Sequence, residues 1–360
     1  MKRFSILSRF ALPVLALSIL SIGPAMIEAD NGPNHRVRNL HFGVSGGNVN
    51  DTSRRFCCSG TLGALVTDNQ GVRYVLSNNH VVGLSGSASA GQDISQPGLI
   101  DNGCQVHTVV ADFTAAPPLN SNVDAAIAQL RPGLMDGTGF IEDIGTISSA
   151  VRVPSVGLAV QKSGRTTGHT TGSISSINTT VSVRYSKSCG SNNGPVFTFT
   201  NQVVINSSSF SAGGDSGSLI VSNDNCKQPV ALLFAGSSSS TIGNPISLVL
   251  TRLSASIGRT VTFVGGTCTA GPTLEGLSFG NQGLSDETIA RASAIKERRE
   301  NDLFSRPGVI GVGVGTDDDN PFDAVIIVYV DMTSGFSPRL PRRIDGVRVK
   351  TVYTDTFVAY

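Results

Sequence analysis

The sequence predicts an all-β protein with a small α+β region at its C-terminal end, and three observations support this. Glycine is abundant, charged residues make up 15% of the chain, and tryptophan is absent, as in many extracellular β scaffolds. Short apolar runs alternate with turn-forming clusters along most of the sequence. After residue 265, a glycine-rich stretch leads into apolar residues at helical spacing.

The first β region covers about 37–150 and follows a polar, glycine-rich lead-in. Turn sequences at 68–71 and 116–118 separate its apolar runs, because Asp, Asn, Gly and Pro favour turns. The predicted strands are 63–67, 73–76, 106–113 and 124–130.

A second β region over about 151–268 is predicted to contain strands and one helix. Apolar residues recur at helical spacing from Ile246 to Leu253, between a starting Pro245 and a terminating Gly258. The predicted strands are 158–162, 172–185, 196–205, 218–221 and 230–234.

The rest of the chain divides into a linker at 269–283 and a small α+β domain at 284–360. Ser285 is placed to cap a helix that has acidic residues in its first turn. Strand patterns follow at 309–314, 324–330 and 348–352, and no helix follows the glycines at 311–315 as a nucleotide loop requires. A peptide-binding module, an intramolecular chaperone and a cleaved extension remain open as roles for this domain.

Residues 1–25 are predicted to form a secretory signal peptide. Lys2, Arg3 and Arg9 accompany an apolar core at 10–22 that is short for a membrane span. Small residues favour cleavage after Ala25, with Ala29 as the second candidate, and a retained membrane anchor is the alternative. We therefore expect a secreted protein, either extracellular or periplasmic.

Six cysteines in a secreted chain predict a disulfide framework. The sequence does not choose among the possible pairings, and some cysteines could also stay reduced and buried. Cys57 and Cys58 are adjacent and are not expected to pair with each other; we expect one of them to pair with Cys104. The other three cysteines are Cys189, Cys226 and Cys268.

The formal net charge is +1, and no basic stripe runs along the chain, so nucleic-acid binding is disfavoured. The histidines lack a His-x-x-x-His spacing and the cysteines lack a Cys-x-x-Cys pair. We therefore expect neither a metal nor another cofactor.

The most informative stretch is Gly-Gly-Asp-Ser-Gly-Ser at 213–218, followed by an apolar run. Glycine lets the backbone turn tightly and come close to a substrate. The N–H groups of Gly214 and Ser216 can then point at one spot and stabilise an oxyanion beside the serine hydroxyl. Ser216 is therefore a candidate nucleophile, although the same string also fits an ordinary turn.

A serine nucleophile needs a base and a carboxylate that orients the base. His80 ends a predicted strand, in Ser-Asn-Asn-His-Val-Val, and Asp124 precedes one, in Val-Asp-Ala-Ala-Ile. Asp101 and Asp112 are rivals, but neither precedes so clear a strand of small apolar residues. An α/β-hydrolase needs its histidine after the serine, and no histidine follows His169.

These three strings, together with Ser-Gly-Arg-Thr-Thr-Gly at 163–168, resemble those of chymotrypsin-like (trypsin-fold) serine proteases. The resemblance is closest to secreted bacterial members such as the alpha-lytic-type proteases, and it spans about residues 56–255. It implies two antiparallel six-stranded Greek-key barrels, at about 37–150 and 151–268, in a protease domain at 37–268.

The resemblance also implies roles for residues around the serine. Asp215 would be buried and anchor the oxyanion loop, paired with Arg165 rather than with a new N-terminus. The region 207–213 contains no carboxylate, so a neutral or apolar side chain is expected before the cleaved bond. The substrate pocket would be formed near Phe210, Ser211, Ala235 and Gly236.

The expected function is that of a secreted serine endopeptidase acting on protein or peptide substrates. Ser216 would be the nucleophile of an acyl-enzyme pathway, with His80 as base and then acid, and Asp124 as its orienter. The alternatives are a catalytically silent binding protein of the same fold, and an adhesion or inhibitor-like protein that works through its C-terminal domain. No membrane contact is expected after signal removal, and a monomer is the working expectation.

Overall fold

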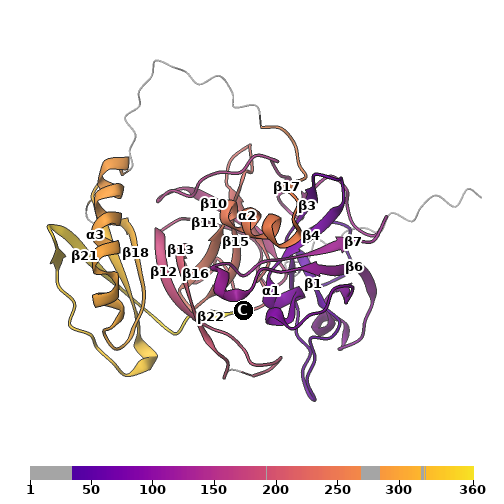
Figure 1. Ribbon diagram of the computed structural model, residues 1–360, viewed down its shortest axis with the longest axis horizontal. Coiled ribbons are helices and arrows are strands. Elements are labelled where there is room, and N and C mark those ends of the chain that lie inside the picture. Colours follow the sequence, from indigo (N-terminus) through magenta and orange to yellow (C-terminus); the bar gives the residue numbers. More distant parts are fainter. Residues whose placement is uncertain (1–34, 192, 269–283, 318–319, 321) are drawn as a thin grey trace, which may run out of the picture.

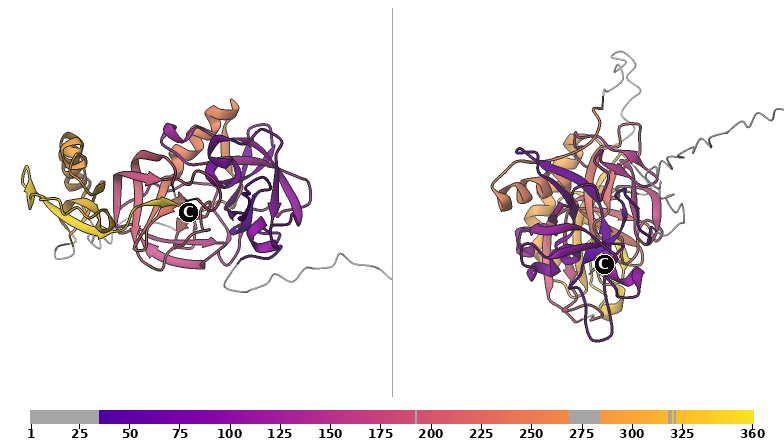
Figure 2. Two further views of the ribbon diagram at one scale, coloured as in Figure 1. Left: turned by 90° about the horizontal axis from the view of Figure 1, so that it is seen from below. Right: turned by 90° about the vertical axis from the view of Figure 1, so that its right-hand side faces the viewer.

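The computed structural model describes residues 35–191, 193–268, 284–317, 320 and 322–360. The predicted signal peptide at 1–25 and the predicted linker at 269–283 lie outside the described residues. Two curled β-sheets stand side by side, and a smaller helix-and-sheet unit adjoins the second of them (Figures 1 and 2). The all-β prediction is therefore confirmed, with the α+β part at the C-terminal end.

The first sheet has the strand order β17-β3-β4-β7-β6-β5-β1-β2, with antiparallel neighbours. Its interior is packed with aliphatic and aromatic side chains such as Leu65, Val75 and Ile127, which are 0% exposed. The strands are β1 (Val44–Asn48), β2 (Gly60–Leu62), β3 (Ala64–Asp68), β4 (Arg73–Ser77), β5 (Asp93–Gln96), β6 (Thr108–Ala115), β7 (Ala126–Leu130) and β17 (Val261–Phe263). The short strands β8 (Phe140–Ile141) and β9 (Gly145–Thr146) form a separate hairpin.

The turn predicted at 68–71 joins β3 to β4. The Asp68 carboxylate accepts the N–H groups of Gln70 and Val72, each at 2.9 Å, and Gly71 has a φ of +81°. Glycine adopts this left-handed conformation without strain, whereas a β-branched residue would not. This hairpin leads β4 directly to the candidate histidine.

The second sheet begins with the order β11-β10-β14-β15-β16-β13-β12. The strands are β10 (Ala159–Gly164), β11 (Gly168–Ser173), β12 (Ser176–Arg184), β13 (Val196–Asn206), β14 (Leu219–Ser222), β15 (Pro229–Gly236) and β16 (Ser240–Pro245). The prediction of a single strand at 172–185 is wrong, because the strand is interrupted after Ser173. The residues before the interruption pair with β10, and those after it pair with β13.

Three α-helices are described, and the two longer ones agree with the predicted caps. Helix α2 (Ile246–Ile257) lies between Pro245 and Gly258, whose φ is +67°, and packs its apolar face into the core of the first sheet. Helix α3 (Asp286–Phe304) is capped by Ser285, whose hydroxyl accepts the Thr288 N–H at 3.2 Å. Helix α1 (Asn79–Val82) is a single turn after β4.

The C-terminal unit continues the second sheet. Strand β18 (Val309–Thr316) pairs with β12, β19 (Ala324–Asp331) pairs with β18, and β21 (Val347–Thr354) pairs in parallel with β19. The short β20 (Arg343–Ile344) pairs with β21, and α3 packs across this sheet (Figure 1). The chain then returns to the second barrel as β22 (Val358–Ala359), between β12 and β15.

Three disulfides join the six cysteines. Cys57 bonds to Cys104, which confirms the expected pairing inside the first barrel. Cys58 bonds to Cys189 and so links the two barrels, and the third disulfide joins Cys226 to Cys268. None of the helices that the structure describes has both the length and the apolar character needed to cross a bilayer.

Candidate active site

The candidate histidine and aspartate come together between the two barrels. His80 lies on the short α1, immediately after β4, and its Nδ1 is 2.5 Å from Oδ2 of Asp124. Asp124 lies in the loop before β7, which pairs with β4. Because these strands are neighbours in the sheet, the two loops at their ends are adjacent. The Asp124 side chain is 0% exposed, and the His80 side chain is 11% exposed.

Asp124 makes more hydrogen bonds than the sequence indicated. Oδ2 also accepts the hydroxyl of Tyr185 at 2.7 Å, and Oδ1 accepts the backbone N–H of His80 at 3.2 Å. The Asp124 N–H donates to the side-chain oxygen of Asn244 at 2.9 Å. A buried carboxylate needs such donors to stay ionised. Sequence reasoning missed Tyr185 and Asn244, since neither residue has a local sequence signal of this role.

These contacts shift the protonation equilibria of the cluster. Burial acts to lower the pKa of His80, but the charge and hydrogen bond of Asp124 outweigh it, so the pKa is raised above its usual value. Burial, together with the negative charge of Asp124, raises the pKa of Tyr185 well above its usual range. Tyr185 therefore stays protonated and donates its hydrogen to the carboxylate.

Ser216 lies in the tight turn before β14, where its carbonyl accepts the Thr61 N–H of the first barrel at 2.8 Å. Gly214 has a φ of +98°, which confirms the need for glycine there. Among the described residues, none accepts a hydrogen bond from the N–H of Gly214 or Ser216. Two unpaired donors therefore flank the serine, as an oxyanion site requires. The Ser216 hydroxyl donates to the Phe234 carbonyl at 3.2 Å, not to His80.

The expected pairing of Arg165 with Asp215 is wrong in this structure. The cation next to the buried Asp215 carboxylate is Lys162, with Nζ 3.5 Å from Oδ2 and both side chains 0% exposed. Asp215 also accepts the N–H groups of Thr166 and Thr167 at 2.8 and 3.1 Å. With three backbone N–H donors in all and a lysine from the same hairpin, the carboxylate has no need of a guanidinium.

Arg165 instead pairs with Asp101, one of the rival carboxylates. Its Nε and Nη2 donate to the two Asp101 oxygens at 2.5 and 2.6 Å, and both side chains are largely buried. A side chain at Gly214 would collide with Arg165, because an added Cβ would lie 2.5 Å from Nη1. Arg165 thus covers the oxyanion loop from outside. The other rival, Asp112, pairs with Arg131 far along β6.

The predicted pocket residues line one region of the second barrel. Phe210 is 0% exposed within the barrel core, and the Ser211 hydroxyl contacts that of Thr241 at 2.6 Å. Ala235 and Gly236 are the last residues of β15. Their outer edge is paired with the C-terminal strand β22.

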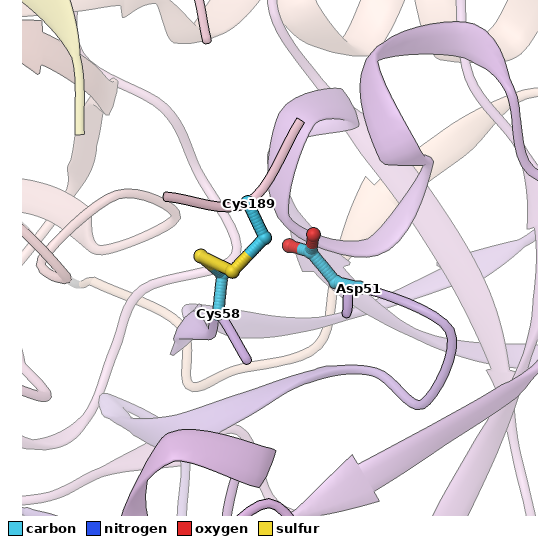
Figure 3. Close-up of side chains that lie close together, drawn as sticks. All are labelled: Asp51, Cys58 and Cys189. Carbon is cyan, nitrogen blue, oxygen red and sulfur yellow. A yellow bond between two sulfur atoms is a disulfide. The ribbon is translucent and has the colours of Figure 1, made fainter. Parts of the chain in front are cut away.

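A fourth acidic group approaches the site from the first barrel. Asp51 lies beside the Cys58–Cys189 disulfide (Figure 3). Because the two sulfurs are bonded to each other, they offer no thiolate to a metal ion. Burial raises the pKa of the Asp51 carboxyl to about 6, and the nearby positive charge of His80 acts in the opposite direction.

Comparison with solved structures finds serine proteases. A glutamic-acid-specific serine protease is 22% identical, covers 62% of this chain and all of its own, and has a TM-score of 0.43. Cellulomonas bogoriensis chymotrypsin is 17% identical over 63% of this chain and 99% of its own, with a TM-score of 0.41. A Nocardiopsis protease is 16% identical over 59% and 95%, with a TM-score of 0.40. No model of a protein family and no curated protein sequence matches the chain.

The two curled sheets, with the candidate site between them, agree with the chymotrypsin-like double barrel that the sequence motifs imply. The chain is similar to the serine proteases named above. At these identities and TM-scores, what those proteins cleave says nothing about the substrate of this chain.

Proposed function

We propose that the protein is a serine endopeptidase with Ser216, His80 and Asp124 as its catalytic residues. The observation that carries the proposal is the fully buried Asp124, which is hydrogen-bonded to His80 Nδ1 at 2.5 Å. It stands together with the N–H groups of Gly214 and Ser216, for which no described residue is an acceptor. A histidine oriented by a buried carboxylate is what a weak hydroxyl nucleophile needs.

The reaction proceeds in two steps, acylation of Ser216 and hydrolysis of the acyl-enzyme. Ser216 Oγ attacks the peptide carbonyl carbon while His80 Nε2 takes the hydroxyl proton, and the N–H groups of Gly214 and Ser216 stabilise the resulting oxyanion. His80 then gives the proton to the leaving amine, and an ester to Ser216 remains. Water attacks this ester with His80 again as base, which releases the new carboxyl group and restores the serine.

Asp215 and Lys162 have a supporting role in this proposal. Asp215 is flanked by Gly214 and Ser216, so its buried hydrogen bonds hold the turn that aims the two oxyanion donors. Neither side chain is placed to touch the substrate. Their removal is expected to loosen the oxyanion turn, and the protein does not require a newly cleaved N-terminus to build it.

We further propose that the protein acts outside the cytoplasm on protein or peptide substrates. Three disulfides support this location, because such bonds persist in oxidising compartments. The predicted signal peptide at 1–25 is the matching targeting signal, and the domain boundaries 37–268 and 284–360 remain part of the proposal.

Labelling with a fluorophosphonate, followed by peptide mapping, tests the proposal. We expect the label on Ser216, with Ser216→Ala unlabelled and Asp124→Asn labelled at least 100-fold more slowly. The wild-type and variant proteins should unfold at similar temperatures. A folded protein that stays unlabelled even after release of the C-terminal strand described below would favour the silent binding protein instead.

A further inference from the structure

The C-terminal strand β22 lies along the edge of β15 as an extended peptide. Ala359 is paired with Ala235 and Val358 with Gly236, in antiparallel register. The Tyr360 N–H points to the Phe234 carbonyl at 3.4 Å. This is β-augmentation by a segment of the same chain, in which backbone pairing supplies affinity and alternate side chains supply selectivity. In Figure 1 and in the left view of Figure 2, the C-terminal end lies between the two curled sheets.

The backbone of Tyr360 engages the catalytic base directly. His80 Nε2 is 2.8 Å from the Tyr360 carbonyl oxygen, while Nδ1 faces Asp124. Both ring nitrogens therefore face acceptors, which favours the doubly protonated imidazole, and the Tyr360 oxygen contributes to the raised pKa of His80. A histidine in this form cannot take the Ser216 proton. Ser216 itself is 0% exposed in the full chain.

The side chain of Tyr360 fills the pocket predicted for the substrate. Its hydroxyl donates to the Ser237 carbonyl at 2.9 Å, and its ring lies against Gly236, where an added Cβ would be 2.3 Å from the hydroxyl oxygen. Burial raises the pKa of Tyr360 to about 12, and the Ser211 hydroxyl acts in the opposite direction as a hydrogen-bond partner. The pocket thus accommodates a flat ring and offers polar partners to its hydroxyl.

The C-terminal unit holds this segment in place. Phe357 is 0% exposed, packs against Tyr329 of β19 with ring centroids 5.7 Å apart, and its carbonyl accepts the Arg184 N–H at 2.9 Å. Thr356 donates to the Asp331 carboxylate at 2.5 Å. A peptide tethered this closely has an effective concentration on the order of millimolar, so even a weak ligand would stay bound.

We propose that residues 358–360 are a tethered ligand of the active site, which keeps the full chain closed, and that the pocket they fill selects a tyrosine side chain on the acyl side of the cleaved bond. The inference deepens the proposed protease function and rests on it. External substrates would have a small residue before the tyrosine, at the position that Ala359 takes in the tethered segment. The sequence predicted a neutral or apolar side chain before the cleaved bond, and this proposal narrows that prediction to an aromatic side chain.

Binding tests the inference without any need for catalysis. In the Ser216→Ala background, the full chain is compared with a variant that lacks residues 358–360 and keeps the buried Phe357. The probe is the peptide acetyl-Phe-Val-Ala-Tyr, with Tyr replaced by Arg in a second probe, and binding is measured by calorimetry. Tyr353→Ala in the full chain is the control, since Tyr353 is 57% exposed and no described contact ties it to the site.

We expect the shortened chain to bind the tyrosine peptide at least tenfold more tightly than the full chain or the Tyr353→Ala control does. The shortened chain should also bind the tyrosine peptide at least tenfold more tightly than it binds the arginine peptide. Equal binding by the full and shortened chains, or no binding by either, overturns the tethered ligand. Equal binding of the two peptides overturns the tyrosine pocket.

Fluorophosphonate labelling of the corresponding chains with Ser216 intact separates this inference from the proposed function. Faster labelling of the shortened chain, by at least tenfold, supports both. Peptide binding by the shortened Ser216→Ala chain without any labelling of its serine counterpart leaves the tethered ligand standing and refutes the protease.

Discussion

The buried pair of Lys162 and Asp215 offers the sharpest test of how the oxyanion turn is supported. The ammonium nitrogen is 3.5 Å from Oδ2, and neither side chain is exposed. Lys162→Met keeps most of the side-chain volume and removes the charge. Because it leaves a buried carboxylate without its cation, we expect the free energy of unfolding to fall by about 3 kcal/mol.

The magnitude follows from two opposing contributions. Opposite charges at this separation attract each other by about 5 kcal/mol at an effective dielectric constant of about 20. Methionine also removes the cost of burying the ammonium, since burial by itself lowers the pKa of Lys162. Asp215 further keeps its hydrogen bonds from Thr166, Thr167 and Ala212. These gains offset about 2 kcal/mol of the loss.

Double-mutant cycles identify the partner. Urea denaturation gives the free energy of unfolding for Lys162→Met, for Asp215→Asn and for the double variant, and we expect a coupling energy of about 2–3 kcal/mol. The matched cycle uses Arg165→Met with Asp215→Asn, for which the coupling should lie within about 0.5 kcal/mol. Arg165→Met with Asp101→Asn is the positive control, because two hydrogen bonds join those side chains.

A larger coupling of Asp215 to Arg165 than to Lys162 would refute this reasoning and restore the pairing that the sequence suggested. The comparison does not depend on activity. It is therefore informative even for a chain held closed by its C-terminal segment.

Three further predictions concern the titrating groups around the site. Tyr185→Phe removes a donor to Asp124 and should slow labelling of the chain that lacks residues 358–360 by about 10–150-fold, because a hydrogen bond to a charged group contributes about 1.5–3 kcal/mol. The rate at which the full chain is labelled should fall as the pH drops through the pKa of His80, which lies above 6.5, since His80 must lose a proton to act as base. The midpoint of this pH profile should move to lower pH in the chain that lacks residues 358–360, because the Tyr360 oxygen contributes to the raised pKa. The raised pKa of Asp51 means that the folded protein binds its proton more tightly than the unfolded chain, so stability is lost as pH rises from 3.8 to about 6. Asp51→Asn should therefore raise the free energy of unfolding by about 1–2 kcal/mol above pH 6.5 and not at pH 3.5, as measured by urea denaturation.

Local sequence was sufficient for the elements whose chemistry is local. The turn at 68–71, the caps of α2 and α3, and the glycine at 214 each depend on a few adjacent residues, and the structure agrees with all of them. The candidate triad was also accessible, because each member lies in a short string with a strand on one side. The structure brings His80 and Asp124 into contact, and the Ser216 carbonyl accepts the Thr61 N–H of the first barrel.

Contacts between distant segments could not be predicted in this way. Lys162 and Arg165 lie on the same hairpin, three residues apart, and only the path of the folded chain decides which of them reaches Asp215. Tyr185, directly after β12, and Asn244, on β16, reach Asp124 from the other barrel. A hydrogen bond of this kind depends on how the two barrels meet, and no pattern within one strand encodes that.

The C-terminal segment shows most clearly which features follow from local sequence and which depend on the tertiary structure. By itself, the sequence determined an all-β enzyme-like framework and a candidate nucleophile with its base and acid, because glycine turns, apolar periods and short motifs are properties of neighbouring residues. Only the tertiary structure decided that Tyr360 lies against His80, 280 residues away. The physical reason is that β12 pairs with β18, and this extension of the sheet carries residues 358–359 back to pair with β15.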